Sequence, residues 1–342
     1  MKIVFMGTPD FARESLEALY NTKNEIELVV TNPDRKKGRG MKVIESPVKE
    51  FAKEKQINIS QPEKVKNNQE FINQLRELEP DLLVVVAYGK ILPKEVLDIP
   101  KYGAINVHGS LLPKYRGAAP IQWAIINGEK ETGVTTMFMD VGMDTGDMIL
   151  KEKVSISDDE TTGELWQRLS KIGGELLVRT VEEIEEAAKN IEKDKQDGIK
   201  ELIKQEIHVE KQGNDYTLAP MLEKEMSKID WNKDARTLKN LIRGLDPIMG
   251  TYTFYNGKKI KIWKADVVNV SNCNENAELN NLKDYKNGEI IIADKKKGLY
   301  VKTGNNTILS ILELQAENSK RMNVKEFLNG NNIKEKDTFK DC

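Results

Sequence analysis

Short apolar runs alternate with amphipathic stretches along the first half of the chain. The runs are rich in β-branched residues, as is typical of buried strands, and they cover residues 2–6, 27–31, 82–87, 104–107 and 135–139. Helical patterns lie between several of them; Thr8 and Ser46 stand where they can cap TPDFARESLEALY and PVKEFAKEKQ. Strand, helix and strand in this order predict an α/β fold with a doubly wound, mostly parallel, Rossmann-like sheet.

The pattern changes after residue 160. TTGELWQRLSKIGGELLVRTVEEIEEAAKNI places apolar residues on one stripe and predicts a long helix, and a polar stretch that is poor in apolar residues follows it. Farther along, short strand patterns are separated by turns such as Asn256-Gly257, with one helix near DARTLKNLIRGL, which favours a small β-barrel. We therefore expect a first domain over 1–188, a linker over 189–205 and a barrel over 206–342, with a surface insertion at 268–285.

Composition narrows the class of protein. The chain is 39% hydrophobic and 32% charged, as expected of a globular protein with a real core. The opening MKIVFMGTPD is too short in apolar residues for a signal peptide, and no long apolar span follows, so we expect a cytoplasmic protein. The two cysteines, Cys273 and Cys342, exclude a disulfide framework. The net charge of −2 argues against an evenly basic surface, although residues 205–342 are the more basic part.

The candidate catalytic side chains lie at the ends of predicted strands. In open α/β sheets the ligand binds at the carboxyl ends of the strands, so the loops after the last three apolar runs should converge on one crevice. Asn106 and His108 are two residues apart on a strand and share a face. Asp144, in DVGMDTGD, follows the next strand and can reach the same crevice. These three groups suit acyl transfer: an amide can donate a hydrogen bond to a developing oxyanion, an imidazole can transfer protons, and a carboxylate can orient the imidazole.

Other interpretations of these residues stay open at this point. A lone histidine is more often structural than catalytic, and an aspartate in a glycine-rich loop is usually a turn former. Ser110 lies near His108 without a nucleophile-elbow motif, so direct transfer between two bound substrates is favoured over a covalent acyl-enzyme. The other histidine, His208, lies in the predicted linker, so we expect no metal site with histidine ligands. MGTPDFA lacks the glycine spacing of a dinucleotide site.

Two longer stretches carry a resemblance to a known family. NVHGSLLPKYRGAAPIQWAI and TGVTTMFMDVGMDTGDM resemble the folate-dependent formyltransferases. The resemblance implies transfer of a formyl group from 10-formyltetrahydrofolate, with Asn106, His108 and Asp144 as the catalytic residues. YTLAPMLEKEMSKIDW and RGLDPIMGTYTFYNGKKIKIWKA are similar to the second domain, a barrel of oligonucleotide-binding type, of the members that formylate methionyl-tRNA. The expected acceptor is therefore the free amino group of methionyl-initiator-tRNA, the substrate that supplies translation initiation.

The alternatives differ in what they would require of the chain. Glycinamide ribonucleotide formyltransferases resemble the core alone and lack a second domain. Sugar-nucleotide formyltransferases share more and are the closer alternative, but they would gain nothing from the basic loop PDRKKGRG. A non-catalytic RNA-binding protein would have no use for the amide, imidazole and carboxylate. A monomer is expected.

The resemblance also assigns a folate pocket. A proline-terminated apolar turn offers rigid backbone groups and a hydrophobic wall to a flat pteridine, and the matching turn here is Ser110, Leu111, Leu112 and Pro113. Two further loops would complete the pocket with Val86, Tyr88, Gly89, Ile91, Leu92, Asp140 and Gly142.

Basic residues mark the expected tRNA contacts. By itself the loop at 33–42 is typical of a solvated, flexible segment, and its cations are Arg35, Lys36, Lys37, Arg39 and Lys42. The resemblance implies that this loop enters the acceptor stem and becomes ordered there, with Arg39 reading the unpaired first position. Lys259 and Lys261 share a strand face and predict a stripe that follows phosphates; lysines guarding an exposed edge are the alternative.

Overall fold

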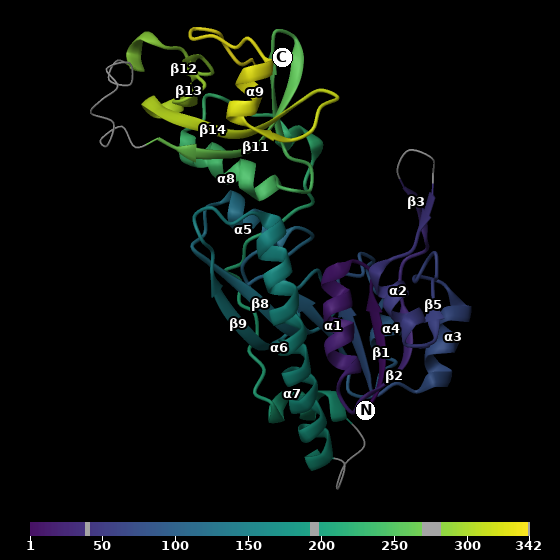
Figure 1. Cartoon of the computed structure of the whole chain (residues 1–342). Helices are drawn as coiled ribbons and strands as arrows, with labels where there is room; N and C mark the ends of the chain where they lie inside the picture. Colours follow the sequence, from purple (N-terminus) through teal and green to yellow (C-terminus); the bar gives the residue numbers. More distant parts are fainter. Residues whose placement is uncertain (38–41, 192–197, 269–281, 341–342) are drawn as a thin grey trace. The chain divides into compact units, whose positions relative to one another are not determined.

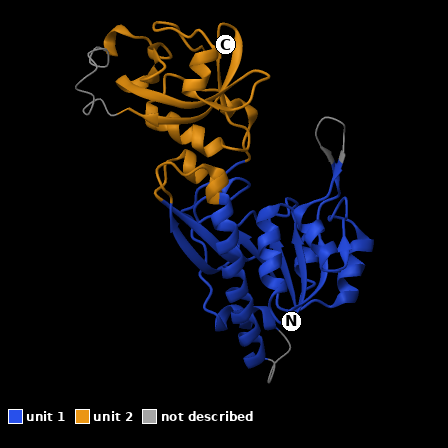
Figure 2. Cartoon of the chain, in the orientation of Figure 1, with its two compact units in different colours: residues 1–120, 131–155, 166–220 blue, residues 121–130, 156–165, 221–342 orange. Residues whose placement is uncertain are grey.

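The computed structural model describes residues 1–37, 42–191, 198–268 and 282–340 (Figure 1). Its internal contacts divide the chain into two compact units, coloured in Figure 2. The first unit holds residues 1–120, 131–155 and 166–220, and the second holds 121–130, 156–165 and 221–342. Two short segments from the first half of the chain are thus part of the second unit, an arrangement that differs from the single boundary expected from composition.

A seven-stranded sheet forms the centre of the first unit, in the order β5-β2-β1-β6-β7-β8-β9. The first five strands in this order are parallel, and β8 and β9 are antiparallel to their neighbours. The predicted mostly parallel sheet is therefore confirmed. The bounds are β1 (Lys2–Gly7), β2 (Glu25–Val30), β5 (Ile59–Ser60), β6 (Leu82–Val86), β7 (Ala104–His108), β8 (Glu131–Phe138) and β9 (Met148–Ser155).

All five predicted strands are present, whereas the two edge strands of the sheet were not predicted: the two-residue β5 and the longer β9. Its sequence, MILKEKVS, places Lys151, Glu152 and Lys153 in a row, and most of its residues are half-buried. Edge strands tolerate charge because one side faces solvent, so no apolar run marks them. By contrast, β6 is buried at every position, as expected of a strand in a sheet covered on both faces.

Helices connect the strands of the first unit: α1 (Asp10–Tyr20), α2 (Pro47–Glu54), α3 (Gln69–Leu78), α4 (Lys94–Leu97), α6 (Thr162–Ile191) and α7 (Ile199–Glu206). Ser46 caps α2 as predicted, since its Oγ accepts the Lys49 N–H at 3.1 Å. The predicted cap of α1 is wrong: Pro9 occupies that position, and Thr8 Oγ1 accepts a hydrogen bond from Asn32 Nδ2 instead. No helix in the described ranges is long and apolar enough to cross a membrane.

The stretch predicted as a linker, 189–205, contains helix structure. Helix α6 runs on to residue 191, and α7 begins at residue 199 with Ile199 and Ile203 buried. Two apolar residues four apart are enough to seat a short helix, although the surrounding composition is polar. The chain then packs on the first unit, where Glu210 exchanges two backbone hydrogen bonds with Met148 at 2.8 and 2.9 Å.

The second unit is built on an antiparallel sheet in the order β10-β11-β14-β13-β12, with β15 paired to β14. Residues 339 and 340 bond to both ends of this order, Lys340 to Phe254 in β10 and Phe339 to Gly288 just before β12, so the sheet closes in the manner of the predicted barrel. The bounds are β10 (Thr251–Tyr255), β11 (Lys258–Val267), β12 (Ile290–Asp294), β13 (Gly298–Thr303), β14 (Thr307–Ala316) and β15 (Met322–Asn323).

Helices complete the second unit: α5 (Pro120–Ile126), most of which belongs to it, α8 (Ala235–Leu245) and α9 (Val324–Gly330). Helix α8 is the one predicted from DARTLKNLIRGL, and Asp234 caps it by accepting the Thr237 N–H at 3.0 Å. The predicted turn at Asn256-Gly257 joins β10 to β11 with positive φ at both residues. Most of the predicted insertion, residues 269–281, lies outside the described residues.

Candidate active site

The end of β7 presents the amide and the imidazole, as the alternation of the strand predicts. His108 is 5% exposed, and its Nε2 lies 2.9 Å from the carbonyl oxygen of Tyr115. A carbonyl only accepts, so Nε2 carries a hydrogen and donates it. The other ring nitrogen, Nδ1, lies 3.6 Å from Asp144 Oδ2. Asn106 is half-buried two residues earlier, and within the described part of the chain nothing hydrogen-bonds its side chain.

Asp144 reaches this place by a route that the sequence did not indicate. Strand β8 runs antiparallel to β7, so Phe138 at its end lies opposite Ile105 and away from His108. The loop between β8 and β9 returns along the sheet and brings Asp144 back to the imidazole. Asp144 has a φ of 54°, in the left-handed region that non-glycine residues adopt at a cost. Its Oδ2 also accepts the Gly117 N–H at 2.8 Å, which holds the carboxylate in place.

The turn after β7 is held by its own hydrogen bonds. Ser110 Oγ donates to the Lys114 carbonyl at 2.6 Å, so this hydroxyl is not poised beside His108 as a nucleophile. Thr135 Oγ1 donates to the Ser110 carbonyl and accepts the Leu112 N–H. The side chains of Ser110 and Leu112 are buried. The turn therefore forms a rigid support, and these two side chains do not line an open pocket.

A cavity opens beside Asp144. Its lining comes from the loop after β6, the end of β8 and the loop after β8, namely Lys90, Ile91, Leu92, Met137, Met139, Asp140, Val141, Gly142, Met143 and Asp144. The predicted Ile91, Leu92, Asp140 and Gly142 are among these residues; Val86, Tyr88, Gly89 and the turn at 110–113 are not. Ile91, Val141 and Met143 are 79%, 69% and 63% exposed. Exposed apolar side chains around a carboxylate suit a flat, largely apolar ligand.

The side chain of Tyr88 is buried and does not line this cavity. It packs in the core with residues such as Val85 and Val96, and its hydroxyl finds no hydrogen-bond partner among the described residues. Burial raises the pKa of Tyr88 to about 12. Its backbone does contribute to the loop, because its carbonyl accepts Asn32 Nδ2 at 2.7 Å.

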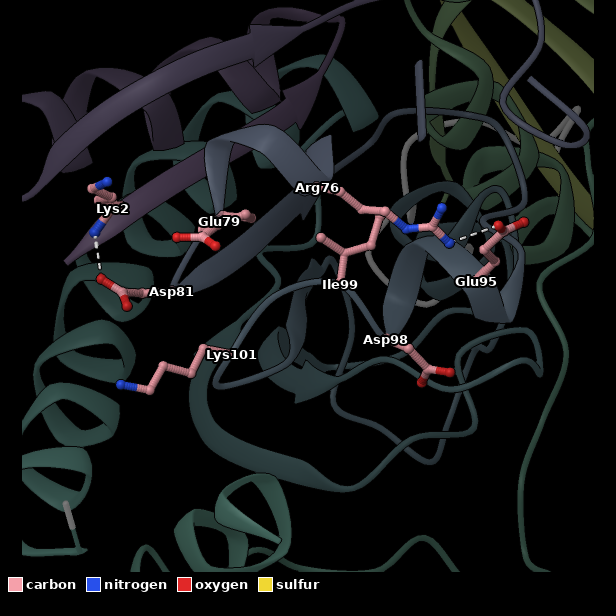
Figure 3. Close-up of a pocket in the computed structure, with 9 residues that line it drawn as sticks. Lys2, Arg76, Glu79, Asp81, Glu95, Asp98, Ile99 and Lys101 are labelled. Carbon is pink, nitrogen blue, oxygen red and sulfur yellow. Dashed lines mark hydrogen bonds and ion pairs between the residues drawn. The ribbon is translucent and has the colours of Figure 1, made fainter. Parts of the chain in front are cut away.

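A second hollow in the first unit lies at the other edge of the sheet. Figure 3 shows its charged side chains, and it lies by the amino ends of β1, β6 and β7, at Lys2, Asp81 and Lys101. Arg76 pairs with Glu95 at 2.9 Å, and Lys2 N–H donates to Asp81. Mixed charges that pair with one another do not select a ligand, so the candidate site is the one at the end of β7. Among the described residues, no group of three or more His, Cys, Asp or Glu side chains is placed to hold a metal ion.

Two short strands flank the central residues of the basic segment at 33–42. Strands β3 (Arg35–Lys37) and β4 (Lys42–Ile44) pair antiparallel and stand off from the sheet of the first unit (Figure 1). Arg35 is exposed. Arg39 lies outside the described residues, as do the side chains of Lys36, Lys37 and Lys42.

Lys259 and Lys261 lie on the outer face of β11, the same face for both, as predicted. Lys259 Nζ is 3.6 Å from the ring centre of Tyr252, and Lys261 Nζ is 4.9 Å from that of Trp263. Tyr252 is also the cross-strand partner of Lys261. Cations over aromatic rings form a mixed surface that can meet both phosphates and bases. The aromatic half of this surface was missed, although the Asn256-Gly257 turn fixes the register that brings it there.

Comparisons with known proteins agree with this architecture. Residues 1–181 match the formyl transferase family, and residues 221–332 match the formyl transferase C-terminal domain. A methionyl-tRNA formyltransferase of Caldanaerobacter subterraneus subsp. tengcongensis is 48% identical over 335 residues, which is 98% of each chain. One from Clostridium perfringens is 50% identical over 334 residues, covering 97% of this chain and 98% of its own.

A solved structure shares the fold at lower identity. An N-formyltransferase from Helicobacter canadensis, in complex with folinic acid and dTDP-3-aminofucose, has a TM-score of 0.58 and 18% identity, covering 93% of this chain and all of its own. At this identity the likeness shows the architecture alone. The two closer relatives, aligned nearly end to end, show the family: the chain belongs to the methionyl-tRNA formyltransferases.

Proposed function

We propose that this protein transfers the formyl group of 10-formyltetrahydrofolate to the α-amino group of methionyl-initiator-tRNA, acting as a monomer in the cytoplasm. The observation that carries the proposal is the approach of His108 and Asp144 to 3.6 Å at the end of β7, beside an apolar cavity, with Asn106 two residues earlier on the same strand. Membership in the methionyl-tRNA formyltransferases supports the choice of acceptor.

The chemistry assigns one task to each side chain. The amine attacks the formyl carbon, a new C–N bond forms, and the carbonyl oxygen becomes an oxyanion. The Asn106 amide and protonated His108 donate hydrogen bonds to that oxygen. Because Nε2 is held by the Tyr115 carbonyl, Nδ1 is the nitrogen that acts. Asp144 orients the ring and takes the proton shed by the amine. The bond to the folate nitrogen then breaks, and that nitrogen takes the proton from Asp144, which returns to its carboxylate form.

In this proposal the folate binds in the cavity beside Asp144. Ile91, Val141 and Met143 offer exposed apolar surface for the pteridine. The turn at 110–113 supports the wall of the pocket from behind. The folinic acid in the Helicobacter canadensis structure is consistent with a folate site in this fold. The transfer uses side chains alone and needs no metal ion.

The tRNA is proposed to contact both units. The basic hairpin would enter the acceptor stem, with Arg39 at the unpaired first position and Arg35, Lys36, Lys37 and Lys42 on phosphates. Lys259 and Lys261 would follow the phosphate backbone, with Tyr252 and Trp263 available for stacking.

The acceptor can be identified directly. The protein is incubated with 10-formyltetrahydrofolate and, in separate reactions, charged initiator tRNA, elongator methionyl-tRNA and an amino-sugar nucleotide. Formylation of the initiator tRNA is expected to be fastest. If the amino-sugar nucleotide alone were formylated, the proposed acceptor would be wrong, and the protein would be a sugar-nucleotide formyltransferase instead.

Arg39→Ala tests the hairpin. The variant should raise the KM for initiator tRNA and leave folate affinity unchanged, because the proposed contact is with nucleic acid only. Equal losses for the two substrates would show that the hairpin is not a dedicated tRNA contact. Lys64→Ala, an exposed lysine elsewhere on the first unit, is the matched control.

A further inference from the structure

A glutamine outside the predicted catalytic domain joins the two halves of the site. Gln212 lies in the stretch after α7. Its Nε2 donates hydrogen bonds to the carbonyls of Asp144 and Gly146, both at 2.8 Å. Its Oε1 accepts Arg116 Nε, also at 2.8 Å. One half-buried side chain therefore holds the loop that carries Asp144 and the turn that leads to Gly117.

The same stretch also fixes the backbone around His108. Thr217 Oγ1 accepts the Tyr115 N–H at 2.8 Å, and the Thr217 carbonyl accepts the Arg116 N–H at 2.9 Å. Tyr115 is left-handed, with φ 63°, a conformation that persists only where the surroundings impose it. Its carbonyl in turn receives the Nε2 hydrogen of His108. The stretch thus fixes the surroundings of the imidazole through Thr217 and those of the carboxylate through Gln212.

We propose that Gln212 is a positioning residue for formyl transfer, holding the Asp144 loop against the 115–117 turn so that the carboxylate stays beside His108. The inference rests on the proposed function. Asp144 sits in an exposed loop and in a costly backbone conformation, so its place depends on contacts from outside the loop. A neutral amide supplies two donors and one acceptor; neither glutamate nor methionine supplies both.

Two substitutions separate the two arms of the contact. Gln212→Met keeps the length and loses every hydrogen bond. Gln212→Glu keeps an acceptor for Arg116 but turns an oxygen toward the carbonyls of Asp144 and Gly146, which repel it. Both should lower kcat by about tenfold or more with little change in either KM, since displacements near 1 Å cost up to about 100-fold in rate. Wild-type kcat in either variant overturns the proposal.

A double variant distinguishes positioning from a general loss of structure. In an Asp144→Asn background, Gln212→Met should change kcat by less than about twofold, because the residue it positions is already disabled. An equal loss in both backgrounds would overturn the proposal. Gln205→Met, on the exposed side of α7, should match wild type, and thermal unfolding of each variant confirms folding. Rates are compared on whichever amine the wild-type protein formylates, so failure of the proposed acceptor would be seen separately in the wild type.

Discussion

The end of β7 and the outer face of β11 handle polar groups in opposite ways. His108 is nearly buried, and its ring lies between the Tyr115 carbonyl and the Asp144 carboxylate. Lys259 is exposed and Lys261 half-buried, and the ammonium of each lies near an aromatic ring; Lys261 Nζ also donates a hydrogen bond to the Met249 carbonyl at 2.9 Å. The first region can act only if its geometry is kept. The second can act through charge and flat surface, which tolerate movement.

The difference sets the expected scale of damage. Displacing a donor in a preorganised site removes stabilisation that exists only in the transition state. Removing one of several exposed cations removes one phosphate contact among many. Substitutions at the two regions should therefore differ in size and also in which quantity they change.

The largest effect is expected at the oxyanion donors. His108→Ala and Asn106→Ala should each lower kcat by roughly 10²-fold or more, the scale of a lost oxyanion donor. Folate and tRNA binding should stay close to wild type, because neither side chain is proposed to bind ground-state substrate strongly. Single-turnover formylation and equilibrium binding measure the two quantities. Turnover near the wild-type value in either variant would remove that residue from the mechanism.

Alanine substitutions at two glycines, one in each region, test the difference between the regions directly. Gly117 has a φ of 127°, and an added Cβ would lie 2.6 Å from the Ala219 carbonyl oxygen. Gly117→Ala must move the turn and its bond to Asp144, so kcat should fall by about tenfold or more. Gly257, in the β10–β11 turn, has a φ of 73° with nothing within 4 Å of such a Cβ. Gly257→Ala should cost about 1–2 kcal/mol of stability and leave kcat alone.

Kinetics and thermal unfolding of both glycine variants check this contrast. A Gly117→Ala variant with normal kcat would mean that the turn adapts without disturbing Asp144. A Gly257→Ala variant with reduced kcat would mean that the hairpin of the second unit matters to the chemistry, against the division of roles drawn above.

The sequence predicted local relations well and distant ones poorly. That Asn106 and His108 share a face follows from strand alternation, and the Ser46 cap follows from local chemistry. The contact of Gln212 with Arg116 joins residues 96 apart in a polar stretch without periodicity, so no local signal marks it. The place of Asp144 was predicted on the assumption that β8 ends at the same edge of the sheet as β7. Strand β8 in fact ends at the opposite edge, and Asp144 reaches His108 because the loop after β8 runs back along the sheet.

The second unit shows the same limit. The hairpin turn and helix α8 were visible in the sequence because turn residues and apolar periodicity are local signals. Closure by Phe339 and Lys340 depends on pairing with residues far away in the sequence, Gly288 and Phe254. No short stretch encodes it, although the barrel itself was expected from the spacing of the turns.

A moderate effect is expected at the outer face of β11. The log–log slope of tRNA affinity against salt should flatten by about 1 to 2 when Lys259 and Lys261 are both changed to alanine, because each phosphate contact contributes about 0.7–0.9. The kcat at saturating tRNA should not change. Binding titrations at several salt concentrations measure the slope, with Lys325 and Lys334, two exposed lysines of the second unit, as the control pair. An unchanged slope would mean that these lysines do not contact phosphates and only protect an exposed strand edge from aggregation.

The smallest effect is expected where charge serves the fold alone. In the second unit Asp158 accepts hydrogen bonds from Arg236 at 2.7 and 2.8 Å and from buried Lys239 at 3.1 Å. The hydrogen bond from Arg236, then that from Lys239, holds the pKa of Asp158 below its ordinary 3.8. A lowered carboxyl pKa contributes stability above the ordinary pKa, and this contribution is lost as the pH falls through the lowered value.

Asp158→Asn should therefore lower the free energy of unfolding at pH 7, and with it the unfolding temperature. The loss should be no more than about 1 kcal/mol, because the carboxylate is about half exposed and solvent screens it. The gap to wild type should persist at pH 5 and narrow below about pH 4, where the carboxylate of the unfolded chain begins to take up protons while that of the folded protein stays charged. Asp215→Asn, an exposed aspartate, is the control in thermal scans at each pH. A gap that stayed constant down to pH 3 would mean that Asp158 acts by shape, and a change in kcat would mean that its charge also serves the reaction.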